Sequence, residues 1–194
     1  MGTVYNLPPK VEPEEKYSVK TGANRIGLFS LDTTNLDANS YLPSFTPICA
    51  DLAKKTAKVV RNAKVTVEAT ATDVAIKVAK GSLFVTGMFI GNGSKGGTIT
   101  AVDKTNADYD LITVDATLGV KLVVGTVLFE ATAAGGTVQK NVANSALYGR
   151  WQVVSGPNNI TLLRTAAEIE PSKLTIPFSS NDKAAMAGWF QFNE

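Results

Sequence analysis

Short apolar runs separated by turn-forming residues make up most of the chain. Within residues 64–71, every second residue from Val65 to Ala71 is apolar, and a period of two indicates a half-buried strand. Residues 83–90 form a longer apolar run with an expected bend at Gly87. Turns recur roughly every ten residues, which is typical of all-β domains. The pattern predicts a mostly β fold, either a small antiparallel barrel or a sandwich.

Two segments near the C-terminus carry helical signals. Residues 181–187 begin with Asn181, a capping residue, and are followed by Gly188. These signals predict one short C-terminal helix. Residues 165–169 are expected to form one helical turn that ends before Pro171.

The N-terminal residues 1–24 combine prolines with interleaved acidic and basic side chains. Proline fixes φ and lacks an N–H, so we expect an extended arm. Val4, Tyr5 and Leu7 are apolar residues in this polar segment and are the expected partner-docking residues; a frayed terminus is the alternative. The expected organisation is an arm (1–24) followed by a β-rich globular domain (25–194), with two subdomains, about 25–130 and 131–194, as an open alternative.

The chain contains no histidine and a single cysteine, Cys49. These absences exclude histidine triads, histidine bases, histidine metal ligands, intrachain disulfides and cysteine-rich zinc sites. Hydrophobic residues make up 44%, enough for a core, and the net charge of +2 gives no reason to expect a nucleic-acid or membrane partner. We therefore predict no enzyme activity, no catalytic residues, no cofactor and no metal site.

A glycine-rich loop, Gly91-x-Gly93-x-x-Gly96, matches the spacing of a dinucleotide-binding fingerprint. That fingerprint requires a helix after the loop, because the pyrophosphate sits on a helix N-terminus. Residues 98–102 are instead rich in β-branched side chains. We therefore predict a hairpin connection and no phosphate cradle.

Four aspartates lie close together in the sequence, at Asp103, Asp108, Asp110 and Asp115. Leu and Ile occupy the middle of this segment, so the calcium-loop pattern of an EF-hand is absent. We interpret the aspartates as strand-end turn residues, and a loose surface Ca²⁺ site stays open as the alternative.

A basic run follows Cys49, and its only acid is Asp51. The basic residues are Lys54, Lys55, Lys58, Arg61 and Lys64. We interpret residues 51–62 as a helix with a solvated face, and docking to an acidic surface is the functional alternative. With no histidine to activate it, Cys49 is interpreted as a small core or loop thiol.

Several stretches together are similar to head proteins of tailed phages. They are residues 80–93, 99–103, 108–119 and 124–131, with 142–148 and 164–170 adding to the likeness. Across residues 75–170 the chain resembles capsid decoration and head-fibre-type proteins from phages of Bacteroides-like bacteria. The resemblance implies a non-enzymatic virion protein, assembled in the host cytoplasm, that binds capsid protein and itself, often as a trimer. It transfers no catalytic or binding residue.

Two other classes of function stay open beside the virion protein. The first is an adhesin-like or carbohydrate-binding β-domain, for which aromatic side chains would supply stacking surfaces. Its candidates are Tyr41, Tyr109, Tyr148, Trp151 and Trp189. The second is an enzyme that uses carboxylates alone, which is disfavoured because no aromatic-flanked acid pair stands out.

Overall fold

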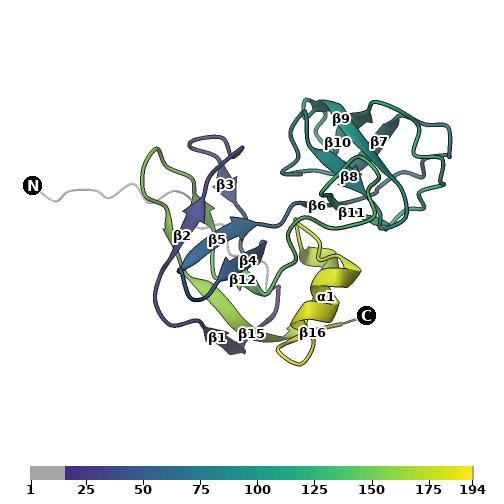
Figure 1. Ribbon diagram of the computed structural model, residues 1–194. Coiled ribbons are helices and arrows are strands. Elements are labelled where there is room, and N and C mark those ends of the chain that lie inside the picture. The colour runs from purple at the N-terminus through teal and green to yellow at the C-terminus, as the bar shows by residue number, and fades with distance from the viewer. Residues whose placement is uncertain (1–15, 194) are drawn as a thin grey trace, which may run out of the picture.

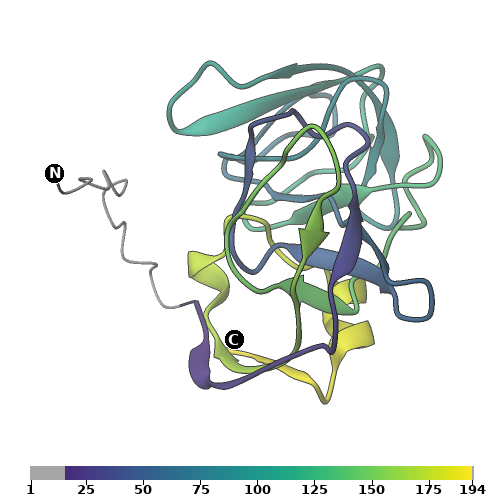
Figure 2. The ribbon, with the colours of Figure 1, turned by 90° about the vertical axis from the view of Figure 1, so that its left-hand side faces the viewer.

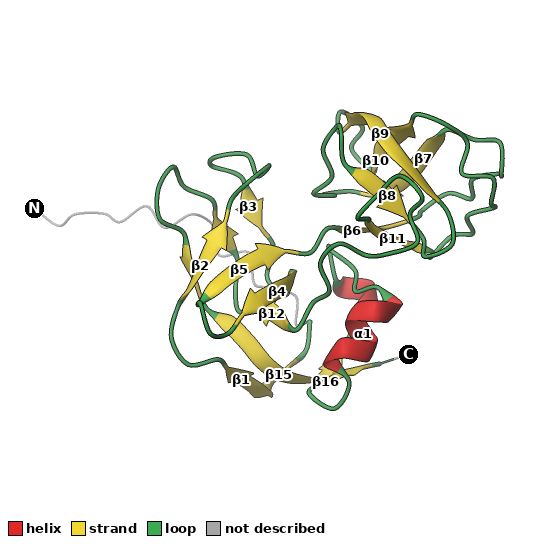
Figure 3. Ribbon diagram, viewed as in Figure 1, coloured by secondary structure: helices red, strands yellow, loops and turns green. Residues whose placement is uncertain are grey.

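The computed structural model describes residues 16–193, and nearly all of its regular structure is strand (Figures 1 and 3). One α-helix, α1 (Ser180–Met186), and one 3₁₀ turn, η1 (Pro171–Lys173), complete the described elements. The predictions of a mostly β fold and of one short C-terminal helix are confirmed. The helix is capped by Ser179 and not by Asn181, because the Ser179 hydroxyl accepts the N–H of Asp182 at 3.1 Å.

A large sheet forms one lobe of the molecule. Its strands are β1 (Ser18–Asn24), β2 (Phe29–Asp32), β4 (Pro47–Asp51), β5 (Thr56–Val59), β12 (Ser145–Leu147), β14 (Asn159–Ile160), β15 (Leu162–Ile169) and β16 (Phe190–Phe192). They follow the order β1-β15-β12-β4-β5-β2-β14, and β16 also pairs with β15. Pairing is antiparallel except for β2 with β5 and β15 with β16. A small ribbon of β3 (Tyr41–Leu42) and β13 (Trp151–Gln152) lies beside this sheet.

A second sheet curls into a small barrel that forms the other lobe. Its strands are β6 (Asn62–Lys64), β7 (Ala75–Ala79), β8 (Phe89–Gly91), β9 (Gly96–Asp103), β10 (Tyr109–Val114) and β11 (Val127–Glu130). The order is β6-β11-β8-β9-β10-β7, and a bridge between Val65 and Val78 brings the two edges together. Alternate residues of β10 point inward, so Ile112 is fully buried and packs with Ile76 and Ile99.

The barrel is inserted into the chain of the large sheet. The chain enters the barrel after β5 and returns to the large sheet at β12 (Figure 1). Strands from before and after residue 130 therefore share the large sheet. The boundary between the lobes does not coincide with the boundary of the alternative subdomains, about 25–130 and 131–194. The large sheet keeps two clusters of buried apolar side chains, one around Phe29 and Ile160 and the other around Phe45 and Phe178.

The expected helix at residues 51–62 is wrong. The carboxylate of Asp51 accepts the N–H groups of Ala53 and Lys54 at 3.0 Å each, which closes a tight turn. Lys55 adopts a positive φ of 54°, and the chain then enters β5 with alternating exposed and buried side chains. Pairing of β5 with both β4 and β2 outweighs a helix that local composition alone would allow.

The expected helical turn at residues 165–169 is also wrong, because this segment lies within β15. Neighbouring strands β1, β12 and β16 all pair with β15. Within the apolar run at residues 83–90, only Phe89 and Ile90 are in a strand, and they belong to β8. Residues 64–71 make β contacts chiefly through the end of β6 and through isolated bridges at Val65 and Ala69.

The predicted arm extends less far into the chain than residue 24. Residues 18–24 form β1, which pairs antiparallel with β15, although two register shifts interrupt the ladder. Residues 1–15 lie outside the described residues. The strands β1 and β16 lie together at the end of the large sheet that is distant from the barrel (Figures 1 and 2).

Candidate interaction surfaces

The root of the N-terminal arm is fixed to the large lobe. Val4, Tyr5 and Leu7, the expected docking residues, lie outside the described residues. At the first described residue, the Lys16 carbonyl accepts the N–H of Glu170 at 3.0 Å. The ring of Tyr17 packs on Phe45 with 5.0 Å between centroids, and burial raises the pKa of the Tyr17 hydroxyl. The first described residues, Lys16 and Tyr17, are therefore fixed to the large lobe.

A buried ion pair lies where the chain passes between the lobes. The Arg61 guanidinium is 3.3 Å from the Glu130 carboxylate, and both side chains are buried. Arg61 also donates to the carbonyls of Leu83 at 3.0 Å and Thr34 at 2.8 Å. Lys140 Nζ lies 2.7 Å from the other Glu130 oxygen. These contacts fix the β2–β3 loop and the β7–β8 loop to the same pair of crossing segments.

A second buried junction centres on Asp182 of α1, which is fully buried. Its carboxylate accepts hydrogen bonds from Asn62 Nδ2, Gln139 Nε2, Ala143 N–H and Ser179 N–H. Sequence reasoning missed this group. The one available signal was the capping-box spacing of Ser179 and Asp182, which indicates a helix start and reveals nothing about the distant partners.

The glycine-rich loop is a hairpin connection, as predicted. Gly91 at the end of β8 pairs with Gly96 at the start of β9. Asn92 closes the loop by accepting the N–H of Lys95 at 2.8 Å. A Cβ at Gly96 would lie 2.4 Å from the Gly136 Cα, so these glycines are needed for backbone contact with another loop.

Three of the four aspartates have different partners, and Asp108 is exposed. Asp110 is buried beside Lys80, whereas the Asp103 carboxylate accepts the N–H of Thr105 at 2.8 Å. The Asp115 carboxylate accepts the N–H of Thr98, a hydrogen bond that lowers its pKa. Across residues 16–193, no three His, Cys, Asp or Glu side chains gather closely enough to hold a metal ion.

The basic run does not form one charged face. Lys54, Lys55, Lys58 and Lys64 are exposed, but Arg61 is buried in the junction between the lobes. Cys49 is half-buried on β4, and burial raises the pKa of its thiol. A raised pKa keeps the thiol protonated at neutral pH, which makes it a poor nucleophile.

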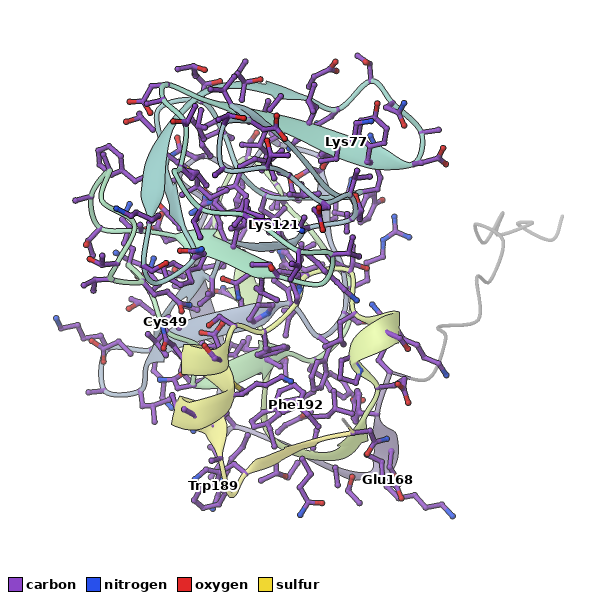
Figure 4. All side chains as sticks on the ribbon, turned by 90° about the vertical axis from the view of Figure 1, so that its right-hand side faces the viewer. Cys49, Lys77, Lys121, Glu168, Trp189 and Phe192 are labelled. Atoms are coloured by element: carbon purple, nitrogen blue, oxygen red, sulfur yellow. The ribbon has the colours of Figure 1, made fainter. Side chains whose placement is uncertain are left out.

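The five aromatic candidates do not come together. Lys77 Nζ lies 4.7 Å from the ring centre of Tyr109 on the barrel, while Trp189 precedes β16. Lys77 and Trp189 lie at opposite ends of the molecule (Figure 4). Trp151 donates its indole N–H to Asn158 at 3.0 Å, and the ring of Tyr41 is contacted by the Arg150 guanidinium at 3.8 Å.

An exposed apolar patch occupies one edge of the large lobe. Ile26 is 91% exposed and Leu28 is 58% exposed on the β1–β2 loop. Lys55 Nζ donates to the Ile26 carbonyl at 3.0 Å, which holds this loop against the β4–β5 turn that carries Leu52, another exposed apolar residue. Large exposed apolar side chains that gather in this way are typical of interaction surfaces.

Comparison with known proteins assigns the chain to a family. The model of the family described as head fiber protein, from phages, matches residues 3–191. This protein belongs to the phage head fiber protein family. The predicted head-fibre-type resemblance is confirmed, and the protein is a structural component of the phage virion. Comparisons with curated proteins and with solved structures gave no match. Within the described chain, none of the helices has the length and apolarity needed to cross a membrane.

Proposed function

We propose that this head fiber protein is a non-enzymatic protein that attaches to the outer surface of the capsid through its arm and self-associates as a trimer. The observation that carries the proposal is the extent of the family match, which starts at residue 3 and ends at residue 191. The shared sequence therefore includes most of the arm together with both lobes.

The chemistry of the side chains supports a structural role. The chain has no histidine, and its one thiol has a raised pKa because of burial. The two most deeply buried aspartates are engaged, since Asp182 accepts several hydrogen bonds and Asp110 contacts Lys80 and the N–H groups of Gly81 and Ser82. Carboxylates held in this way join segments of the fold.

Attachment through the arm is tested by deleting residues 1–15. The deletion leaves β1 intact, and β1 must stay because residues 18–24 pair with β15. We expect an unchanged melting temperature and a loss of co-sedimentation with capsids of the same phage. Aspartate at Val4, Tyr5 and Leu7 should reproduce the loss, because docking of these side chains requires their apolar character.

A control that changes only the charge of the arm separates apolar docking from simple electrostatics. Replacing Glu12, Glu14 and Glu15 with glutamine changes the arm without removing its apolar residues, and binding should persist. Normal co-sedimentation of the protein that lacks residues 1–15 would show that attachment lies elsewhere.

Self-association is supported by the patch formed by Ile26, Leu28 and Leu52. A symmetric assembly would bury this apolar surface. Light scattering should give the mass of a trimer, and Ile26→Asp should give a monomer. Val138→Asp is the control, because Val138 is 57% exposed and lies outside the patch. A wild-type monomer at all concentrations would contradict the proposal.

A further inference from the structure

A preformed pocket of about 190 Å³ lies between the two lobes. The β2–β3 loop contributes Asn35, Asp37 and Tyr41, and the loop after β7 contributes Ser82 and Leu83. Its volume is well below the roughly 300–1,000 Å³ of sites that take drug-sized ligands. The pocket, called the Tyr41 pocket below, therefore fits a single small unit.

The first wall of the Tyr41 pocket is a loop held in one conformation. Its two turns are closed by hydrogen bonds from Leu36 N–H to the Thr33 carbonyl at 2.9 Å and from Ser40 N–H to the Asp37 carbonyl at 3.1 Å. Ser40 also accepts the N–H of Val153 at 2.9 Å through its carbonyl. The loop therefore needs little further ordering when a ligand binds.

The second wall is held by a buried carboxylate. Asp110 Oδ2 accepts the N–H groups of Gly81 at 3.1 Å and Ser82 at 2.8 Å. Its other oxygen lies 3.1 Å from Lys80 Nζ. Lys80 also donates to the Asn106 carbonyl at 2.7 Å, which ties the β9–β10 loop to the same wall. The positions of the polar groups on this side are consequently fixed before a ligand arrives.

Polar side chains that the fold does not use converge on the pocket. Among the described residues, the side chains of Asn35, Asp37 and Lys104 make no hydrogen bond or ion pair. The Ser82 hydroxyl is buried, and it also has no hydrogen-bond partner among the described residues. Tyr41 is 48% exposed at the rim, and the Arg150 guanidinium lies 3.8 Å from its ring centre, so at most one face of the ring can meet a ligand. The pocket thus offers donors, acceptors and one aromatic surface.

The charges of these groups select the class of ligand. Asp37 and Lys104 carry opposite charges, so the unengaged side chains of the pocket favour neither an anion nor a cation. Hydroxyl groups on a small ring can both donate to and accept from such side chains, while the carbon–hydrogen edge of the ring packs on an aromatic surface. We propose that the Tyr41 pocket binds one neutral sugar unit.

The test uses the full-length protein labelled with ¹⁵N and titrated with the methyl glycosides of glucose, galactose, mannose and N-acetylglucosamine. At least one sugar should give saturable amide shifts centred on Gly81 and Ser82. Tyr41→Ala should weaken that binding about tenfold, which corresponds to one aromatic contact. Tyr148→Ala is the matched control, since Tyr148 is also 48% exposed and lies outside the pocket.

Asp37→Asn provides a second variant if Tyr41→Ala fails to fold, because Asp37 is exposed and its carboxylate makes no hydrogen bond or ion pair with the described residues. It should weaken sugar binding while leaving the spectrum of the free protein nearly unchanged. Three results would overturn the proposal: no shifts with any of the four sugars, shifts centred outside the pocket, or saturation of the pocket by inorganic phosphate alone. None of these results bears on capsid attachment, so this proposal and the proposed function fail separately.

Discussion

Replacing Asp182 with alanine removes an acceptor that joins α1 to both segments crossing between the lobes. The donors to its carboxylate are Asn62 Nδ2 at 2.7 Å, Gln139 Nε2 at 2.9 Å, Ala143 N–H at 2.7 Å, Ser179 N–H at 2.9 Å and the Ser179 hydroxyl at 2.8 Å. Because Asp182 is fully buried, water cannot take its place without entering the core. We expect this single substitution to be among the most destabilising in the chain.

The size of the effect follows from which donors lose their only acceptor. The amide of Asn62 also donates to the Pro177 carbonyl, and the amide of Gln139 also donates to the Asn141 carbonyl. The two backbone N–H groups keep no other acceptor. A stranded buried donor costs about 1–3 kcal/mol, so two of them give about 4 kcal/mol. Folded domains are stable by about 5–15 kcal/mol, so the loss is a large fraction of the total.

The assay is urea unfolding followed by tryptophan fluorescence. Asp182→Asn keeps the shape but turns one acceptor into a donor, so we expect about 2 kcal/mol, near half the effect of Asp182→Ala. Asp108→Ala is the control, because Asp108 is exposed, and it should stay within about 0.5 kcal/mol of wild type. A loss below about 1 kcal/mol for Asp182→Ala would refute this account of the junction.

Three further substitutions or measurements test other contacts. Gly136→Ala should destabilise by about 2 kcal/mol or more in urea unfolding, because its Cβ would lie 2.4 Å from backbone; Gly135→Ala, with open space around it, should be neutral or slightly stabilising. Glu130→Gln should cost about 3 kcal/mol by the same assay because it leaves the Arg61 charge buried without its partner. Cys49 should react with a thiol reagent more slowly in the folded protein than in urea, because burial raises its pKa; equal rates would contradict that assignment.

Local pattern was sufficient to predict elements whose partners are close in sequence. The hairpin of β8 and β9 follows from a glycine-rich turn and the β-branched residues after it. The strands β7 and β10 bury alternate residues in the barrel, and this is the period-two pattern from which a half-buried strand is predicted. The closed barrel needs the additional contact between Val65 and Val78, which no local pattern specifies.

Two of the errors fall where distant pairing decides the structure. Ser18 pairs with Ala167, so residues that look like the end of an arm become an edge strand. The same pairing makes residues 165–169 a strand, although their composition is compatible with a helical turn. The Tyr41 pocket could not be predicted from the sequence, because its walls come from loops on different lobes. The sequence identifies Tyr41 only as one of five separate aromatic candidates.

The buried polar groups explain how the two lobes, whose apolar cores are separate, are held against each other. Six of the eleven buried polar or charged residues among those described lie where the lobes and α1 meet: Arg61, Asn62, Glu130, Gln139, Ser179 and Asp182. Burying such groups is unfavourable unless each finds a partner, so the native contacts specify one arrangement of the lobes against others that leave charges unpaired. The two walls of the Tyr41 pocket belong to different lobes, so they keep their spacing only while these contacts hold. Asp182→Ala should therefore alter the amide signals of Gly81 and Ser82, although neither residue touches Asp182.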